Sequence, residues 1–420
     1  MRDNAVRGAL GAKILWNGFA YFLLLLATRA ITISAIGWIT HGSEFTSDIQ
    51  FQQIYAADPF QLILGRSTTW AVFPPLFPLL LSAVHSPISS VLPPFYAMRA
   101  TMCCFELLAW PLVWWIIATN IQGTMRHLVA LAVIFAPICW VTSSVMCQDE
   151  TISMGFFAAI IIALLRHRLG LAMFLCGVAV VVAKIYFLVP LVGLIGLAAD
   201  RSWGTWLRQG FVGVTPIIAV YGLQALLTSR QDQGVKAFAD FAPPTAISIS
   251  AWVIIDQLVT LSAQHAKSVS GILALASSML PLWLFRKRSF VAKPIDQARV
   301  LVAMMLWVFG VFYMINPEYY LLVVPGIILV LRPIATIWTI CVLFSFPWAV
   351  NFFYGVAYGI ALGDEGRSVF VRIYQSVLPW DPKYLQNICV VVTAVVTIGL
   401  AWSLSLCSAS RDVTPGSPES

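Results

Sequence analysis

The sequence predicts an all-α membrane protein with about twelve or thirteen transmembrane helices. Hydrophobic residues make up 60% of the 420 residues and charged residues only 10%, and the mean hydropathy is +0.86. A soluble chain would carry about 25% charged residues. The apolar runs recur from end to end and are continuous rather than alternating, which favours helices over a transmembrane barrel.

Charged residues, glycines and prolines divide these runs into about twelve expected spans. They cover residues 14–36, 101–119, 128–146, 151–165, 169–184, 186–199, 209–228, 269–285, 299–315, 319–332, 334–356 and 387–407. The stretch 70–94 is apolar but rich in proline. It predicts one short span, a re-entrant pair or a juxtamembrane helix. The number of membrane crossings depends on which of the three it forms.

Short basic clusters between the spans predict which loops face the cytoplasm. These clusters lie at 166–168, 201–208, 286–293 and Arg332, so the loops that alternate with them are expected on the opposite, external face. The net charge of +7 is explained by this pattern, and no basic stripe suited to nucleic acid can be drawn. The expected external loops are 37–69, 147–150, 229–268, 316–318 and 357–386.

We therefore expect one transmembrane domain over residues 1–407 and a disordered polar tail over 408–420. Loop 229–268 contains the apolar stretch 242–261, which we interpret as an interfacial helix because a span there would contradict the basic clusters. The basic N-terminus precedes an apolar run without a convincing cleavage site, so the first span is expected to be retained. The eight cysteines are scattered and predict neither a disulfide framework nor a zinc site.

The first external loop, 37–69, is unusually polar for this protein, and it brings Glu44, Asp48 and Asp58 close together in sequence. A carboxylate at a membrane interface can act as a general base toward an acceptor hydroxyl. Asp48 is our candidate for that role, and Glu44 for substrate binding. The alternative is a solvated loop.

A second group of polar residues lies at the ends of strongly apolar runs. Gln148, Asp149 and Glu150 stand between two expected spans, where consecutive acids require partners or solvent. Lys184 ends a later span on the same expected face. A lysine there can hold a phosphate as a point charge, or extend to the interface without a specific function. A minimal polar turn is the alternative for the acidic group.

The third group is Glu318, Tyr319 and Tyr320, between two late spans. A carboxylate followed by two aromatic rings suits a sugar or a phosphate head group. In the last external loop, Arg372 is a candidate for a bidentate phosphate contact. Glu106 lies inside a span and must have a partner. The chain contains no motif for nucleotide-driven pumping or serine hydrolysis.

In this order, the motifs resemble the GT-C superfamily of integral-membrane glycosyltransferases. The first loop is similar to those of the GPI mannosyltransferase I catalytic subunit and of bacterial polyprenyl-phosphate-mannose-dependent enzymes. An acid after the first span is followed by Tyr55-Ala56 and by the stretch 73–76, Phe-Pro-Pro-Leu. The second acid of the family's Asp-x-Asp motif is absent at Gln50, and Cys147 stands where the family has Gly before Gln.

The resemblance implies an inverting transfer of a sugar, mannose above all, from a polyprenyl- or dolichyl-phosphate carrier. The acceptor would be a glycan, lipid or protein, as in glycolipid or polysaccharide synthesis. No cofactor is firmly implied, and the missing second acid puts a divalent metal in doubt. The membrane would be the bacterial inner membrane or the endoplasmic reticulum, with the site on its non-cytoplasmic face. The alternatives are a transporter or lipid-linked-sugar flippase, and a non-catalytic membrane subunit.

Overall fold

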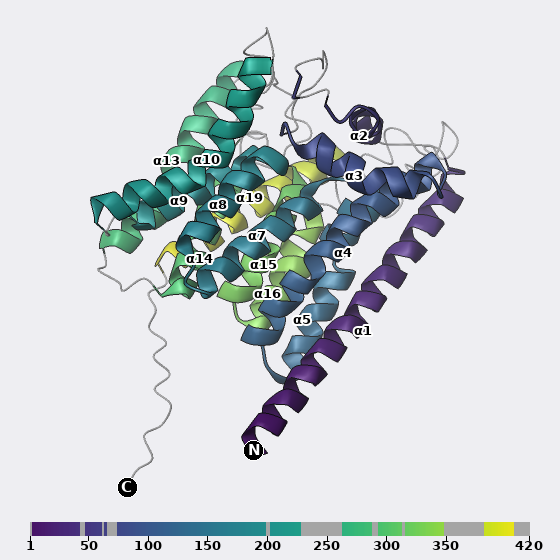
Figure 1. The fold of residues 1–420 in the computed structure, drawn as a ribbon, viewed down its shortest axis with the longest axis horizontal. Coiled ribbons are helices and arrows are strands. Elements are labelled where there is room, and N and C mark those ends of the chain that lie inside the picture. Colours follow the sequence, from purple (N-terminus) through teal and green to yellow (C-terminus); the bar gives the residue numbers. More distant parts are fainter. Residues whose placement is uncertain are drawn as a thin grey trace.

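The protein is an all-α, polytopic membrane protein, as the sequence predicts (Figure 1). The computed structural model describes residues 2–42, 47–60, 63–64, 74–198, 202–227, 263–287, 293–312, 316–347 and 382–406. Within these ranges the regular structure is helical throughout. The expected interfacial helix at 242–261 and the expected tail at 408–420 lie outside the described residues.

The described residues form a series of helical segments. In chain order they are α1 (Arg2–Ile39), α2 (Ser47–Ala57), α3 (Phe77–Ser89), α4 (Pro94–Asn120), α5 (Gly123–Phe135), α6 (Pro137–Trp140), η1 (Val141–Val145), α7 (Glu150–Leu165), α8 (Leu169–Val182), η2 (Ile185–Phe187), α9 (Leu188–Ala198), α10 (Trp203–Leu227), α13 (Ala263–Lys287), α14 (Pro294–Val311), η4 (Pro317–Tyr319), α15 (Tyr320–Val330), α16 (Pro333–Trp338), η5 (Thr339–Leu343) and α19 (Pro382–Leu406).

Among the described residues, six helices are long and apolar enough to cross a membrane, and the bent pair Gly123–Phe135 and Pro137–Val145 would make a seventh. Five shorter apolar helices match the remaining expected spans, at Glu150–Leu165, Leu169–Val182, Ile185–Ala198, Tyr320–Val330 and Pro333–Pro347. The predicted helix order is therefore confirmed over the described residues. Several helices begin earlier than the expected spans, and α13, for example, begins at Ala263, inside the loop expected at 229–268.

Proline marks several helix starts. Pro94, Pro294 and Pro333 stand in the first turns of α4, α14 and α16, where a proline loses no helical hydrogen bond and its fixed φ suits the helix. The central helices are nearly all apolar. Every residue of α15 from Tyr320 to Leu329 is buried, because α15 packs against α4, α7 and α14.

The stretch 70–94 does not cross the bundle in its described part. Helix α3 packs on α2 and α4 and lies across the end of the bundle (Figure 1). The Leu76 amide donates to the Val181 carbonyl at 2.9 Å, which fixes the start of α3 beside the end of α8. The chain then enters α4 at the same end. With 13 residues, α3 is too short to cross a membrane by itself, which favours the juxtamembrane helix among the three alternatives.

Candidate functional site

One end of the bundle gathers charged side chains from segments far apart in sequence. This is the end at which α8 finishes and α4 and α7 begin. Lys184, just after α8, donates a hydrogen bond from Nζ to Asp149 Oδ1 at 3.0 Å. Its Nζ also lies 3.0 Å from Glu150 Oε1. Both carboxylates are 1% exposed, so the charges compensate one another away from water.

The acidic pair owes its place to an unusual turn before α7. Helix η1 has the wider π-helical turn, a form that often occurs at functional sites. Cys147 then takes a φ of +54°, a left-handed conformation that normally favours glycine. The Gln148 amide donates to the Thr142 carbonyl at 2.9 Å. This tight turn allows α7 to begin at Glu150 with almost no loop.

Two tyrosines and a further acid complete this end of the bundle. Lys184 Nζ lies 5.4 Å from the centroid of the Tyr319 ring, close enough for a cation–π contact. The Tyr186 ring packs on Tyr319 at a centroid distance of 5.1 Å. Glu318 is buried and interacts electrostatically with Glu150. We call these residues, Asp149, Glu150, Lys184, Tyr186, Glu318 and Tyr319, the Lys184 cluster.

The first loop docks onto this end through α2. Gln52, which is fully buried, donates from Nε2 to the Cys147 carbonyl at 2.6 Å. Asp48 precedes Gln52 by four positions in α2, and residues four apart share one face of a helix. The backbone therefore puts the position of Asp48 on the face of α2 that contacts the turn at Cys147 and Gln148, which we call the Gln148 turn. The side chain of Asp48 is outside the described part.

The structure brings together most, but not all, of the predicted site residues. Asp149, Glu150, Lys184, Glu318 and Tyr319 lie in one cluster, and Gln148 adjoins it in sequence and is 9% exposed. Tyr320 is not part of it, because its hydroxyl hydrogen-bonds to that of Thr397 at 2.9 Å and its ring packs on Phe344. Glu44 and Arg372 lie outside the described residues.

Sequence reasoning missed three residues at this end. Gln52 and Tyr186 carry no sequence signal that separates them from their neighbours. Arg99 is fully buried near the start of α4, with its guanidinium carbon 3.7 Å from the centroid of the Phe95 ring and NH1 donating to the Phe95 carbonyl at 3.1 Å. A charged residue inside an apolar run was its signal, as it was for Glu106.

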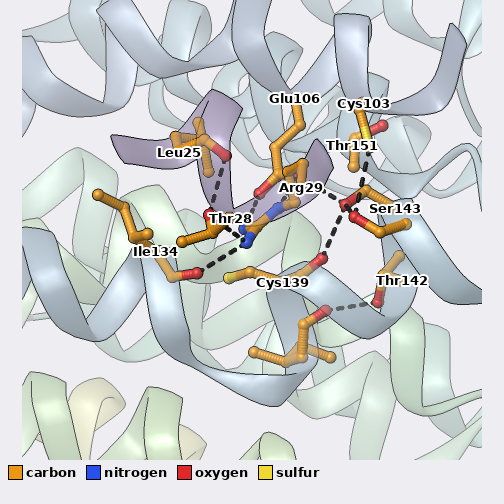
Figure 2. Close-up of polar contacts among 12 residues, drawn as sticks. Leu25, Thr28, Arg29, Cys103, Glu106, Ile134, Cys139, Thr142, Ser143 and Thr151 are labelled. Atoms are coloured by element: carbon orange, nitrogen blue, oxygen red, sulfur yellow. Dashed lines mark hydrogen bonds and ion pairs between the residues drawn. The ribbon is translucent and has the colours of Figure 1, made fainter. Parts of the chain in front are cut away.

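A second polar group lies deeper in the bundle, between α1, α4 and η1 (Figure 2). Arg29 donates from Nε to Glu106 Oε2 at 2.8 Å, and its NH2 group contacts Oε1. Ser143 of η1 donates to the same Oε2 at 2.6 Å. The expected partner of Glu106 is therefore Arg29, in a two-pronged pair of the kind that fits guanidinium to carboxylate.

This buried pair also braces a broken helix. In an unbroken helix the Ile134 carbonyl would accept from the amide of Ile138. The break between α5 and α6 diverts that amide to Ser345 Oγ at 3.3 Å, and Arg29 NH1 donates to Ile134 O at 2.9 Å instead (Figure 2). Since η1 leads directly into the Gln148 turn, the pair fixes the segment that carries Asp149.

The Lys184 cluster offers acceptors for a ligand. Asp149 Oδ2, Glu150 Oε2 and Gln52 Oε1 are buried, and none accepts a hydrogen bond from the part of the chain that the structure describes. An unpaired buried acceptor costs about 1–3 kcal/mol, which a ligand with hydroxyl groups would recover. The tyrosine rings add stacking surfaces, and the ammonium can pair with an anion. Across the same described residues, no three His, Cys, Asp or Glu side chains form a metal-binding group.

In comparisons with known proteins, no family model matches the chain, and no curated protein matches its sequence. The chemistry of the Lys184 cluster is therefore the ground for assigning a function.

Proposed function

We propose that the protein transfers a sugar from a lipid-phosphate carrier to an acceptor hydroxyl at the end of the bundle that holds the Lys184 cluster. The observation that carries the proposal is the convergence of four segments on this end. They are α2, the turn before α7, the residues after α8 and η4, and they hold the Asp48 position, Asp149, Lys184 and Tyr319 in turn.

The groups in the cluster suit a sugar phosphate. The open acceptors of Asp149 and Glu150 match sugar hydroxyls, and the paired rings of Tyr186 and Tyr319 match the apolar face of a pyranose. Lys184 is already charge-paired. Exchange of one carboxylate for a phosphate oxygen would keep the ammonium paired while the donor is bound.

The reaction itself needs one base. We assign this role to Asp48, which would take the proton of the acceptor hydroxyl as that oxygen attacks the anomeric carbon. The bond from the anomeric carbon to the phosphate oxygen breaks, and the lipid phosphate leaves with both bonding electrons. Its leaving oxygen needs no proton, because Lys184 stabilises the developing charge. Attack opposite the leaving group inverts the anomeric centre.

The charges at the other end of the helices support our choice of membrane face. Arg166 and Arg168 stand where α7 ends and α8 begins, at the end opposite Asp149. Loops rich in arginine and lysine stay in the cytoplasm, so the proposed active face is the periplasmic, extracellular or lumenal one. Mannose is our first choice of sugar because the motifs resemble those of mannosyltransferases.

The direct test is transfer from polyprenyl-phosphate mannose in proteoliposomes, with native lipid extract as the source of acceptor. We expect the wild type to release polyprenyl phosphate and Asp48→Asn to do so about 100-fold more slowly or worse, which is the usual contribution of a general base. Asp58→Asn is the control, because Asp58 belongs to the same loop but follows α2. Full transfer by Asp48→Asn would rule out its role as base.

A transporter of lipid-linked sugars is the competing function, and the observation in its favour is the charged pair Arg29–Glu106 inside the bundle. Intramembrane charges often line a transport path. Here, however, Glu106 is paired with Arg29 and Ser143, and both carboxylate oxygens already accept hydrogen bonds within the bundle. Movement of labelled donor across the proteoliposome membrane without cleavage would favour transport over transfer.

A further inference from the structure

A groove on the outer surface of the bundle runs between α9 and α10, away from the Lys184 cluster. Its volume is about 600 Å³, within the range of ligand sites. Ile195 of α9 and Trp206, Phe211, Val214 and Ile218 of α10 line it. The α10 residues recur every three to five positions, so they form one apolar face along the helix.

This groove opens toward lipid. Helix α10 is apolar enough to cross a membrane, yet only 6% of its most apolar 18-residue stretch is buried within the protein. Phe211 and Ile218 are exposed. An exposed apolar surface of a membrane helix is covered by lipid chains, so a hydrocarbon chain is the natural occupant of the groove.

A positive charge at one end of the groove can select lipids by the charge of their head group. Arg208 belongs to the lining and is exposed. It forms no hydrogen bond or ion pair with any residue that the structure describes. Basic residues between transmembrane helices on the cytoplasmic side bind anionic head groups. An apolar groove alone distinguishes no lipid from another, so Arg208 is the group that can select.

Two tryptophans mark the level of the head groups. Trp203 and Trp206 stack with a centroid distance of 4.8 Å, and the Trp206 indole donates to the Ile195 carbonyl at 3.0 Å. Tryptophans gather where a membrane meets water. The stack therefore puts Arg208, within two turns of Trp203, at the depth of the phosphates and the lining residues after it at the depth of the acyl chains.

We propose that this groove is a binding site for an anionic phospholipid, with one acyl chain along α10 and the phosphate at Arg208. The site is separate from the proposed transfer reaction, because α9 leads away from Lys184 and the groove begins at its far half. The occupant is a membrane phospholipid and not the sugar donor.

The test measures lipid binding to the purified full-length protein in detergent by native mass spectrometry, with phosphatidylglycerol and phosphatidylcholine as probes. We expect about a fivefold preference for phosphatidylglycerol, equivalent to ~1 kcal/mol for one basic residue at an anionic head group. Arg208→Gln should abolish the preference. Arg168→Gln is the matched control, because Arg168 is also exposed at this end of the bundle.

A second variant fills the space for the acyl chain and leaves the charge of Arg208 in place. Gly210 lines the groove, and a Cβ atom added there would meet no atom within 4 Å. Gly210→Phe should therefore fill the groove without strain and reduce binding of both lipids. Gly222→Phe is its control, since Gly222 is equally open but lies beyond the lining residues of α10. Melting temperatures without added lipid check that each variant is folded.

The outcomes separate the alternatives. Unchanged lipid preference in Arg208→Gln, or unchanged binding of both lipids in folded Gly210→Phe, overturns the proposal. Stronger binding of undecaprenyl phosphate than of phosphatidylglycerol at the same groove also overturns it, because the occupant would then be a carrier lipid. None of these results depends on whether the protein transfers sugar.

Discussion

Arg29 Nε donates to Glu106 Oε2 at 2.8 Å, and the two side chains are only 2% and 3% exposed. Each charge would be very costly alone in the interior of a membrane protein. Together with Ser143 and the Ile134 carbonyl they satisfy one another. The pair links α1 to α4 and holds the broken segment from α5 to η1 in place.

Removing one partner of this pair should therefore cost much more than removing both. We expect Glu106→Gln to lower the free energy of unfolding by about 3–5 kcal/mol, because Arg29 is left as an uncompensated buried cation. Arg29→Gln should have a similar effect. The double variant should lose clearly less than the sum of the two, as measured by a double-mutant cycle of denaturant unfolding in micelles. Additive losses would show that the charges are not coupled.

The break between α5 and α6 gives a smaller, local prediction. Ser345 accepts a hydrogen bond from the Ile138 amide at 3.3 Å and is buried. Ser345→Ala should leave that amide unpaired and cost about 1–3 kcal/mol. Ser277→Ala is the control, since the half-buried Ser277 donates only to the Leu273 and Ala274 carbonyls of its own helix. Equal melting temperatures for the two variants would contradict the assigned role of Ser345.

The positions of the helices could be predicted from the sequence, and the partners of the charges could not. Apolar runs bounded by proline and charge mark helices because each span must satisfy its own backbone in lipid. Glu106 was expected to need a partner, but its choice of Arg29 depends on how α1 and α4 are rotated and packed against each other. No local pattern encodes that rotation.

The same limit applies to the candidate site. Asp149, Glu150 and Lys184 were expected on one face because the spans alternate in direction, and that expectation needed only topology. Gln52 reaches the Cys147 carbonyl through the folding of a loop back over the bundle, which hydropathy does not register. Tyr320 was expected to join Tyr319 in the candidate site. As the first residue of α15, it packs into the core of the bundle instead.

Lys184 tests whether the acidic pair depends on its counter-charge. Lys184→Met would leave Asp149 and Glu150 adjacent and buried without the ammonium, at a cost of about 3–5 kcal/mol. Lys184→Arg should keep most of the stability, because a guanidinium can also pair with both carboxylates. Adding Asp149→Asn to Lys184→Met should recover part of the loss. The measurement is the unfolding midpoint in detergent, and no recovery in the double variant would mean that the lysine acts mainly through packing.

Cys147 tests the strained turn before α7. Its φ of +54° costs a residue with a Cβ atom about 1–2 kcal/mol, whereas glycine accepts it freely. We therefore expect Cys147→Gly to be more stable than Cys147→Ala, although glycine removes more of the side chain.

Cys176 provides the matched comparison, because it is equally buried but lies within the regular helix α8. There the order should reverse, and Cys176→Gly should be less stable than Cys176→Ala by about 1 kcal/mol, the usual difference between these residues in a helix. The four unfolding free energies, measured under one condition, decide the matter. If alanine were the more stable residue at both positions, the left-handed turn would not be what holds Gln148 and Asp149 in place.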